Sequence, residues 1–183
     1  MNPNFEHDKN EAVQWAQNLL RREFVILDTE TTGLYNAQAV QIAAIAETGK
    51  MLLNTLIQPT IPIDPEAIRI HGITNEMLGD APSFPTMYKK IRRVLENESL
   101  VIYNAAYDWP IICNQCNEHR LEQIPIRTLV CAMEWYAQYT GEWNNWHQSY
   151  KWQRLPGGDH SALGDCQATL ALIQKMANVT VSI

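Results

Sequence analysis

The amino-acid sequence predicts an α/β protein with a five-stranded mixed sheet flanked by helices. Three apolar segments rich in β-forming residues follow one another at 24–27, 40–47 and 51–57. From residue 84 onward, helical segments alternate with short strands. Strands in succession, followed by alternating helices and strands, are typical of a mixed sheet with helices packed on its faces. The first three strands are expected to be antiparallel.

The composition is that of a globular protein. Of the 183 residues, 46% are hydrophobic and 19% are charged, which excludes disorder as the main state. No segment approaches the roughly 18 apolar residues of a membrane span, and the N-terminus lacks the pattern of a secretory signal. A cytoplasmic protein that binds no membrane is therefore expected. The net charge of −6 argues against a coat protein with a basic face, but not against an enzyme whose carboxylates hold divalent cations.

The N-terminal half begins with a helix and three strands. Apolar residues at helical spacing predict a helix over 9–22, within an N-terminal helical extension of residues 1–22. The run Phe24–Leu27 is continuously apolar, which indicates a buried strand. The link Thr48–Lys50 is short, so the second and third strands are expected to form an antiparallel hairpin.

The rest of the chain follows a proline-rich connector, Pro59–Pro65. No internal repeat and no linker divides the sequence, so a single domain over 1–183 is expected. The remaining patterns predict helical pieces at 65–70 and 75–79, a helix at 84–97, a strand at 100–104, a helix at 108–119, a strand at 126–130, a helix at 131–139 and a final helix at 161–177.

Two carboxylates, Asp28 and Glu30, come directly after the apolar run of the first strand. Residues two apart on a strand point to the same side, so both side chains are expected on one face at the carboxyl end of a buried strand. Adjacent negative charges repel unless a cation bridges them, and a divalent cation that prefers oxygen ligands fits. The alternative is that both carboxylates are solvated where the strand reaches the surface.

Three further candidates lie near the starts of helices. Asp108 precedes Pro110, a residue favoured in the first turn, so Asp108 is expected at or just before a helix start, where it could simply be a cap. Asp165 lies on the flank of the apolar stripe of the last helix and can face the sheet edge. His160 follows two glycines, which favour a loop, and from this loop its imidazole can reach Asp165. Alone, this histidine would be an ordinary surface residue.

Taken in chain order, the segments that contain these four acids and His160 resemble the motifs of the DEDDh branch of the DnaQ-like 3′–5′ exonucleases. Members of that family have a ribonuclease-H-like fold. The three motifs of that branch are matched by Asp28–Leu34 (DTETTGL), Asn104–Asp108 (NAAYD) and His160–Asp165 (HSALGD). Ile70–Thr74 (IHGIT) matches a segment often found between the first two motifs. The resemblance spans about residues 23–177. Tyr103 and Tyr107 depart from the pattern, because the family often has His and Phe at these positions.

The resemblance implies a two-metal mechanism. Asp28, Glu30, Asp108 and Asp165 would hold two Mg²⁺ or Mn²⁺ ions, which clamp the attacking and leaving oxygens of an in-line displacement. His160 would be the general base that takes a proton from the attacking water, since an imidazole titrates near neutral pH. The products would be nucleoside 5′-monophosphates released from the 3′ end. Because all five positions are present, an inactive descendant is not expected.

The resemblance also implies which residues contact the substrate. Thr31, Thr32 and Leu34 would contact the terminal nucleotide, with Leu34 beside the base. Asn104 and Tyr107, from the second motif, are further candidate substrate-binding residues.

A segment rich in tryptophan, 141–158, precedes the third motif and is expected to be a loop insertion. Aromatic rings with interleaved cations can stack the bases of single-stranded nucleic acid. Trp143, Trp146 and Lys151 are therefore candidate substrate-binding residues at the mouth of the site. The alternative is that these rings pack the insertion onto the protein body or bind a partner protein.

Single-stranded DNA or a 3′ overhang is the expected substrate, because a first motif of the ETTGL type resembles DNA proofreading and repair nucleases more than short-RNA enzymes. RNA remains an alternative, since contacts to the 2′-hydroxyl cannot be read from a sequence. A proofreading or trimming subunit of a larger DNA-processing complex, such as one that trims fragments before CRISPR integration, is also open. The oligomeric state is not determined by the sequence.

Two other classes remain as alternatives. A non-catalytic nucleic-acid docking subunit would depend on the tryptophans rather than on the carboxylates. A redox or zinc protein would use Cys113 and Cys116, whose spacing is that of half a zinc site. No second pair of this kind accompanies them, and a reduced pair on a helix is the simpler interpretation.

Overall fold

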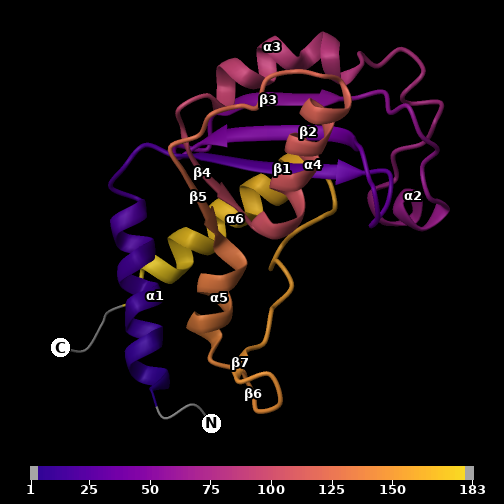
Figure 1. Cartoon of the computed structure of the whole chain (residues 1–183). Coiled ribbons are helices and arrows are strands. Elements are labelled where there is room, and N and C mark those ends of the chain that lie inside the picture. Colours follow the sequence, from indigo (N-terminus) through magenta and orange to yellow (C-terminus); the bar gives the residue numbers. More distant parts are fainter. Residues whose placement is uncertain (1–3, 180–183) are drawn as a thin grey trace.

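A computed structural model describes residues 4–179 and confirms the predicted class, with a five-stranded mixed sheet between two layers of helices (Figure 1). The elements in chain order are α1 (Phe5–Leu19), β1 (Val25–Thr31), β2 (Ala39–Ala46), β3 (Met51–Leu56), α2 (Pro65–His71), α3 (Phe84–Leu95), β4 (Ser99–Ile102), α4 (Ala105–Glu118), β5 (Thr128–Cys131), α5 (Ala132–Thr140), β6 (Trp143–Asn144), β7 (Ser149–Tyr150) and α6 (Ala162–Ala177).

The sheet has the order β3-β2-β1-β4-β5, so β1 lies at its centre. Strands β1, β2 and β3 are antiparallel, as predicted, with Asp28 opposite Ala43 and Glu30 opposite Gln41. Strands β4 and β5 run parallel to β1. The carboxyl ends of β1 and β4 therefore meet at the same edge of the sheet, which is where open α/β sheets place their ligands.

Alternation along β1 divides its side chains between two hydrophobic clusters. Val25 and Leu27 belong to the cluster that includes α3 and α4, whereas Ile26 belongs to the cluster that includes α1, α5 and α6. The same two-residue period continues past the apolar run. It directs Asp28 and Glu30 toward the face covered by α6.

Helices α3 and α4 lie on one side of the sheet, and α1, α5 and α6 lie on the other (Figure 1). Trp15 of α1 and Trp135 of α5 stack with ring centroids 5.1 Å apart and planes 4° from parallel. The Gln17 side chain donates a hydrogen bond to the Ala177 carbonyl at the end of α6. The N-terminal helix is thus an integral part of this layer. Among the described residues, no helix is long and apolar enough to cross a lipid bilayer.

Two helices begin or end three or more residues from their predicted positions. Helix α1 is Phe5–Leu19 rather than 9–22, because the chain turns where the Arg22 amide bonds to the Leu19 carbonyl. The part of the predicted N-terminal extension at residues 1–3 lies outside the described residues. Helix α4 begins at Ala105 rather than 108, because the Asn104 carbonyl already accepts from the Tyr107 and Asp108 amides. Asp108 is therefore in the first turn of α4, and Pro110 lies inside the helix.

The predicted helical piece at 75–79 is wrong, because this segment forms consecutive turns. Leu78 and Gly79 donate to carbonyls three residues earlier, and the pattern does not continue to bonds four residues back. Leu78 packs in a small cluster with residues of α2, including Ala67. The segment thus covers α2 as a folded turn.

The Trp-rich segment contains a short hairpin, β6–β7, that lies apart from the main sheet (Figure 1). Trp143 and Tyr150 face each other across it, with ring centroids 5.1 Å apart in an edge-on arrangement. The Tyr150 hydroxyl donates a 2.5 Å hydrogen bond to a carboxylate oxygen of Asp8, in the first turn of α1. The hairpin is therefore anchored to the N-terminal end of α1.

Replacing Ile26 with Ala is expected to lower the free energy of unfolding by about 2–5 kcal/mol, because the side chain is fully buried on β1, the central strand, and its loss leaves a cavity. Urea denaturation measures the change. The matched control is Met51→Ala, at a side chain that is 57% exposed, where we expect a change below about 0.5 kcal/mol. Equal losses for the two variants would contradict the burial of Ile26 in the core.

Candidate active site

Three carboxylates converge at the carboxyl end of β1. Asp28 and Glu30 extend from β1 toward α6, and Asp165 comes from the first turn of α6. One oxygen from each of the three lies within 4.8 Å of the others. The predicted grouping of Asp28 and Glu30 with Asp165 is therefore present, although Asp165 is 135 or more residues away in the chain.

Asp165 is held by the loop that precedes its helix. Its Oδ1 atom accepts hydrogen bonds from the Asp159 and His160 amides, at 2.9 and 3.3 Å. The helix itself begins at Ala162 and is capped by Ser161, whose hydroxyl accepts a hydrogen bond from the Gly164 amide. The loop and the cap together orient one carboxylate oxygen, which leaves Oδ2 for another ligand.

Asp108 reaches the same place from the other side of β1. It is 5% exposed, in the first turn of α4. Its Oδ1 atom accepts hydrogen bonds from the Thr29 amide and the Thr29 hydroxyl, at 3.1 and 2.7 Å. Thr29 lies between Asp28 and Glu30 and points to the opposite face. The alternation of β1 therefore fixes both its own two carboxylates and the position of Asp108.

Burial and mutual repulsion disfavour the ionised forms of these acids. The pKa of Glu30 is raised to about 8 by burial first, and then by the charges of Asp165 and Asp108. Burial, with repulsion from Asp108, Glu30 and Asp165, raises the pKa of Asp28 well above its ordinary value. The pKa of Asp108 is raised to about 6 by burial, against the opposing effect of its hydrogen bonds from Thr29. A positive charge bound beside these acids would therefore stabilise their ionised forms.

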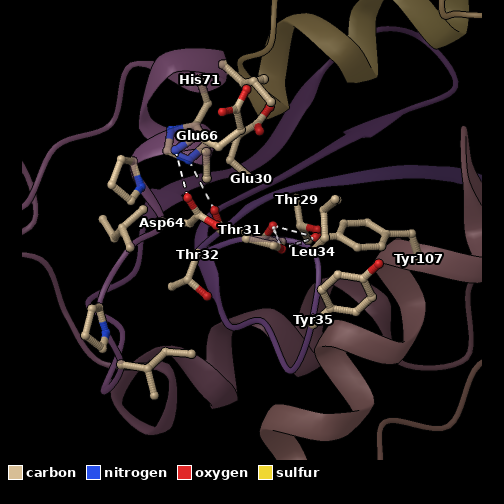
Figure 2. Close-up of a pocket in the computed structure, with 17 residues that line it drawn as sticks. Thr29, Glu30, Thr31, Thr32, Leu34, Tyr35, Asp64, Glu66, His71 and Tyr107 are labelled. Carbon is tan, nitrogen blue, oxygen red and sulfur yellow. Dashed lines mark hydrogen bonds between the residues drawn. The ribbon is translucent and has the colours of Figure 1, made fainter.

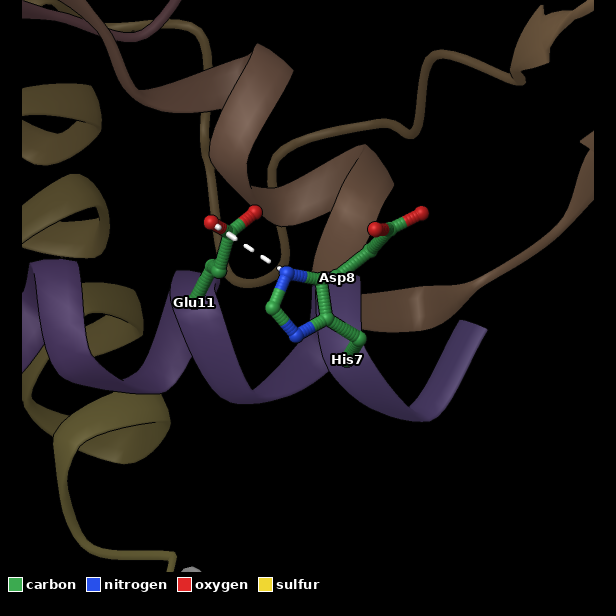
Figure 3. A group of neighbouring side chains, drawn as sticks. All are labelled: His7, Asp8 and Glu11. Atoms are coloured by element: carbon green, nitrogen blue, oxygen red, sulfur yellow. Dashed lines mark ion pairs between the residues drawn. The ribbon is translucent and has the colours of Figure 1, made fainter. Parts of the chain in front are cut away.

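The donor set identifies the kind of cation that would fit. All four acids offer oxygen atoms, and hard divalent cations such as Mg²⁺ and Mn²⁺ prefer oxygen ligands. A second grouping, His7, Asp8 and Glu11, lies on the surface at the start of α1 (Figure 3). There His7 and Glu11 form an ion pair at 3.6 Å, and Asp8 binds the hairpin through Tyr150. That surface grouping thus already serves local packing.

His160 lies on the loop before α6, as predicted, with a left-handed backbone at φ +60°. This conformation is uncommon for residues other than glycine, and it turns the chain sharply into the helix. The imidazole is exposed and lines the same cavity, of about 660 Å³, as Asp28, Glu30, Asp108 and Asp165. The structure therefore brings all five predicted catalytic residues to one cavity.

A second histidine, His71, supports the strand that carries the acids. Its Nδ1 atom accepts a hydrogen bond from the Ile73 amide, so Nε2 carries the hydrogen and donates to the Thr31 carbonyl at 3.1 Å. Burial, together with the nearby His160, lowers the pKa of His71. A neutral His71 thus ties the end of α2 to the end of β1.

A more apolar cavity of about 650 Å³ adjoins the carboxylates, and Figure 2 shows it surrounded by side chains from β1, the loop after it and α2. The two cavities share Thr29, Glu30, Ile70 and Tyr107. Leu34 and Tyr35, on the loop, are 75% and 90% exposed. A flat, apolar group held in this cavity would lie directly beside the acids.

The predicted substrate residues divide into exposed groups and internal ones. The Thr31 hydroxyl lies 2.6 Å from the Tyr107 hydroxyl, and both donate to the Gly33 carbonyl. The Thr32 hydroxyl accepts from the Gln38 amide. These side chains shape the loop after β1. Leu34 remains free to contact a ligand, and Asn104 lines the carboxylate cavity.

The predicted aromatic residues of the Trp-rich segment lie elsewhere. Trp143 packs on Tyr150 in the hairpin, Trp146 is 88% exposed, and Lys151 pairs with Glu142 at 3.8 Å. None of Trp143, Trp146 and Lys151 is among the residues that line the two cavities described above. The part of the segment that does reach the carboxylates comes later, at residues 154–158.

Cys113 and Cys116 are free thiols on α4. Burial raises the pKa of the Cys113 thiol, and burial together with Cys113 raises that of Cys116 to about 11. Both groups are thus held in the thiol form at neutral pH, whereas a metal ligand or nucleophile requires the thiolate.

The sequence did not predict how three residues take part in the site. Thr29 positions Asp108, Arg154 lines the carboxylate cavity, and Gly158 passes close to Asp165. Thr29 could have been found from the alternation of β1 once α4 was placed. Arg154 and Gly158 required the path of the loop, which no periodic pattern encodes.

Without metal, the free energy of unfolding should fall as the pH rises. The raised pKa values mean that the folded protein binds protons that the unfolded chain releases, and this stability is lost between about pH 4, where free carboxyls titrate, and about pH 8, where Glu30 titrates in the folded protein. Mg²⁺ or Mn²⁺ should then raise the melting temperature more at pH 8 than at pH 5. Thermal unfolding in EDTA and in metal measures this, and Glu30→Gln should flatten the pH dependence. An equal metal effect at both pH values would contradict the assignment.

Replacing Gly158 with Ala should impair the site and leave the fold intact. A Cβ atom at this position would lie 2.9 Å from Asp165 Oδ1, closer than real contacts allow, so the carboxylate must move. The expected result is a weaker midpoint for metal-induced stabilisation with an unchanged melting temperature in EDTA. Gly79→Ala is the matched control, because its Cβ would meet the nearest atom at an ordinary 3.5 Å. Unchanged metal binding in Gly158→Ala would contradict the close approach.

Comparison with known proteins agrees with this geometry. A model of the exonuclease family RNase_T matches residues 25–173. A protein of Escherichia phage 186 described as an uncharacterized exonuclease is 36% identical over 181 residues, covering 90% of this chain and 93% of that protein. The epsilon subunit of DNA polymerase III from Pasteurella multocida is 35% identical over 95 residues, which are 46% of this chain and 38% of the subunit. This chain thus matches well under half of that polymerase subunit.

The solved structures that resemble this chain are also exonucleases. Exonuclease X in complex with 5′-overhanging duplex DNA is 28% identical with a TM-score of 0.57, covering 86% of this chain and 95% of that one. Escherichia coli exonuclease I in complex with a dT13 oligonucleotide is 16% identical with a TM-score of 0.68, covering 85% and 41%, and at this identity it supports the fold alone. The family match, the phage relative and the fold agree with the motifs around Asp28, Asp108 and Asp165. The chain belongs to the RNase_T exonuclease family, whose DnaQ-like members share the ribonuclease-H-like fold seen here.

Proposed function

We propose that this exonuclease removes nucleotides from the 3′ end of single-stranded DNA or of a 3′ overhang and releases nucleoside 5′-monophosphates. One observation carries the proposal: carboxylates from β1 and α6 lie within 4.8 Å of one another, with Asp108 and His160 on the same cavity. This arrangement suits hydrolysis of a phosphodiester, in which negative charge on the phosphate must be neutralised.

Asp28, Glu30, Asp108 and Asp165 are the proposed ligands of two divalent cations, Mg²⁺ or Mn²⁺. Bound there, such a pair would acidify the attacking water and stabilise the leaving 3′ oxygen. The charges of the other three acids all raise the pKa of Asp28, so a cation bound beside it would offset repulsion from each of them. The hydrogen bonds to Asp108 and Asp165 hold one oxygen of each carboxylate in place.

His160 is the proposed general base. Its exposed imidazole lies on the rim of the carboxylate cavity, where it can take a proton from the attacking water and release it to solvent. The backbone at His160 is fixed by the left-handed turn and by the bond from its amide to Asp165. The backbone that carries the ring therefore keeps its place relative to the acids, while the side-chain torsions of His160 remain free.

The adjoining apolar cavity is the proposed binding site of the terminal nucleotide. Leu34 would lie beside the base, while the Thr31–Tyr107 pair, Thr32 and Asn104 would shape the loop and the cavity wall. DNA is favoured over RNA because the exonuclease X structure, with 95% of its chain matched, contains DNA. A 3′–5′ exoribonuclease, or a proofreading or trimming subunit of a larger complex, is the alternative, and the matches to polymerase III epsilon subunits favour the latter.

The proposal is tested with a 5′-labelled single-stranded DNA oligonucleotide and an RNA of the same sequence, each in Mg²⁺, in Mn²⁺ and in EDTA. We expect a ladder that shortens from the 3′ end in metal and is absent in EDTA. Asp28→Asn should abolish it, and His160→Ala should lower kcat by about 10²–10⁴-fold, the contribution of a general base. Met51→Ala, remote from the site, is the control.

The outcomes separate the alternatives. A higher rate on RNA would replace the DNA proposal with an exoribonuclease. Shortening from the 5′ end would overturn the polarity. No product on either substrate, with metal binding intact, would favour a docking subunit or the need for a partner protein.

A further inference from the structure

The carboxylate cavity contains one positively charged side chain that the proposed mechanism does not use. Its described lining includes the four acids and His160, and Arg154 is the only lysine or arginine among the lining residues. Four acids and one guanidinium thus line a single cavity. The acids suit cations, whereas the guanidinium suits an anion with several oxygens.

Arg154 is available for such an anion. The guanidinium is exposed, and among the described residues it forms no ion pair within 4.0 Å, although four carboxylates line the same cavity. An arginine that served to neutralise those acids would be paired with one of them. A planar guanidinium with free donors beside a metal-type site instead matches the geometry of a phosphodiester.

The backbone around Arg154 is held in place by Tyr103. Residues 151–158, here called the strap, lead from the hairpin to the active site. The Tyr103 hydroxyl donates a 2.8 Å hydrogen bond to the Gln153 carbonyl of the strap. Tyr103 itself is 8% exposed, and its carbonyl accepts from the Met133 amide and the Cys131 thiol. A buried residue at the end of β4 thus fixes the strap at the residue before Arg154.

Exposure alternates along the strap in the manner of an extended segment. Trp152 and Arg154 are exposed, whereas Gln153 and Leu155 are half-buried, and Leu155 packs on the cluster that includes α6. Anchors on both sides of Arg154 leave its side chain to project from a fixed base. Less backbone freedom is then lost when the guanidinium binds a ligand.

We propose that Arg154 binds a backbone phosphate of the nucleic-acid strand in the carboxylate cavity, and that Tyr103 is the positioning residue that holds it there. The inference rests on the proposed function, because it takes the cavity as the place where the strand is cut. The ligand class is a phosphodiester of single-stranded nucleic acid. Recognition is by charge and by two parallel donors, so it is independent of base sequence.

Binding is measured apart from hydrolysis. A His160→Ala parent in Mg²⁺ is titrated with a fluorescent single-stranded DNA oligonucleotide, and anisotropy gives Kd at several salt concentrations. Arg154→Gln in this parent should weaken binding by about tenfold, as expected for one lost charge-assisted contact. It should also lower the slope of log K against log salt by about 0.7, the value of one phosphate on a single strand. Arg154→Lys should restore the slope but only part of the affinity, because an ammonium cannot bind in the bidentate manner.

Arg127→Gln is the matched control. It removes the same charge from an exposed arginine just before β5, at the opposite edge of the sheet from the carboxylates. Unchanged affinity and slope in the control, with both changed in Arg154→Gln, would support the proposal. Equal effects in the two variants would show a general charge effect and overturn it, and so would an unchanged Kd in Arg154→Gln or a parent that binds no DNA.

A double-mutant cycle tests Tyr103. Tyr103→Phe should weaken binding in the parent by releasing the strap, and it should have no further effect on Kd in Arg154→Gln. An unchanged Kd for Tyr103→Phe in the parent would overturn the positioning role. Additive losses would show that Tyr103 acts independently of Arg154, which overturns its positioning role. The melting temperature of each variant confirms that the fold is retained.

Failure of this inference is distinguishable from failure of the proposed function. Hydrolysis by the unmodified protein, with unchanged binding in Arg154→Gln, would leave the exonuclease proposal in place and remove the role of Arg154. Absence of hydrolysis, with weakened binding and a lower salt slope in Arg154→Gln, would count against the proposed reaction but would support the phosphate site.

Discussion

The organisation of this protein depends on the repulsion among closely spaced carboxylates at the carboxyl end of β1. Asp28 is surrounded by Asp108, Glu30 and Asp165, and each of the three raises its pKa further. Such a grouping is unfavourable by itself, so the fold must supply the free energy that holds it together. The buried strand β1, at the centre of the sheet and covered by helices on both faces, provides that support. A bound divalent cation would relieve this repulsion, so the packing of these acids favours metal binding.

Because side chains alternate along β1, its two faces contact different parts of the site. Asp28 and Glu30 point toward α6 and meet Asp165, while Thr29 points toward α4 and binds Asp108. Two helices far apart in the chain are thereby joined through a single strand. Thr31 continues the second face by meeting Tyr107, which draws the following loop toward α4. The alternation of side chains along β1 thus positions both the wall of the apolar cavity and the carboxylates.

The Trp-rich segment before α6 has two structural roles, one for each half, and its amino-acid composition does not show where the first half ends. Its first half folds into the hairpin, where Trp143 packs on Tyr150 and Tyr150 binds Asp8 of α1. Its second half is the strap, which Tyr103 fastens to the end of β4 before the chain reaches His160. The hairpin thus connects the N-terminal helix to the segment that carries the proposed base. The aromatic rings serve mainly as packing at one end and leave the polar strap to line the cavity at the other.

The sequence alone determined the fold class, the antiparallel hairpin of β2 and β3, and the five residues from Asp28 to Asp165 that meet at one cavity, because strand periodicity and the spacing within the motifs are local properties of the chain. Helix boundaries depend on more than the local pattern: at α4 the Asn104 carbonyl starts the helix before the proline that suggested its start. Only the tertiary structure decided that Thr29 orients Asp108, that Trp143 lies in a hairpin on α1, and that Arg154 lines the same cavity as the acids. These contacts join residues from separate elements through an irregular loop, and no local pattern of side chains encodes such a path.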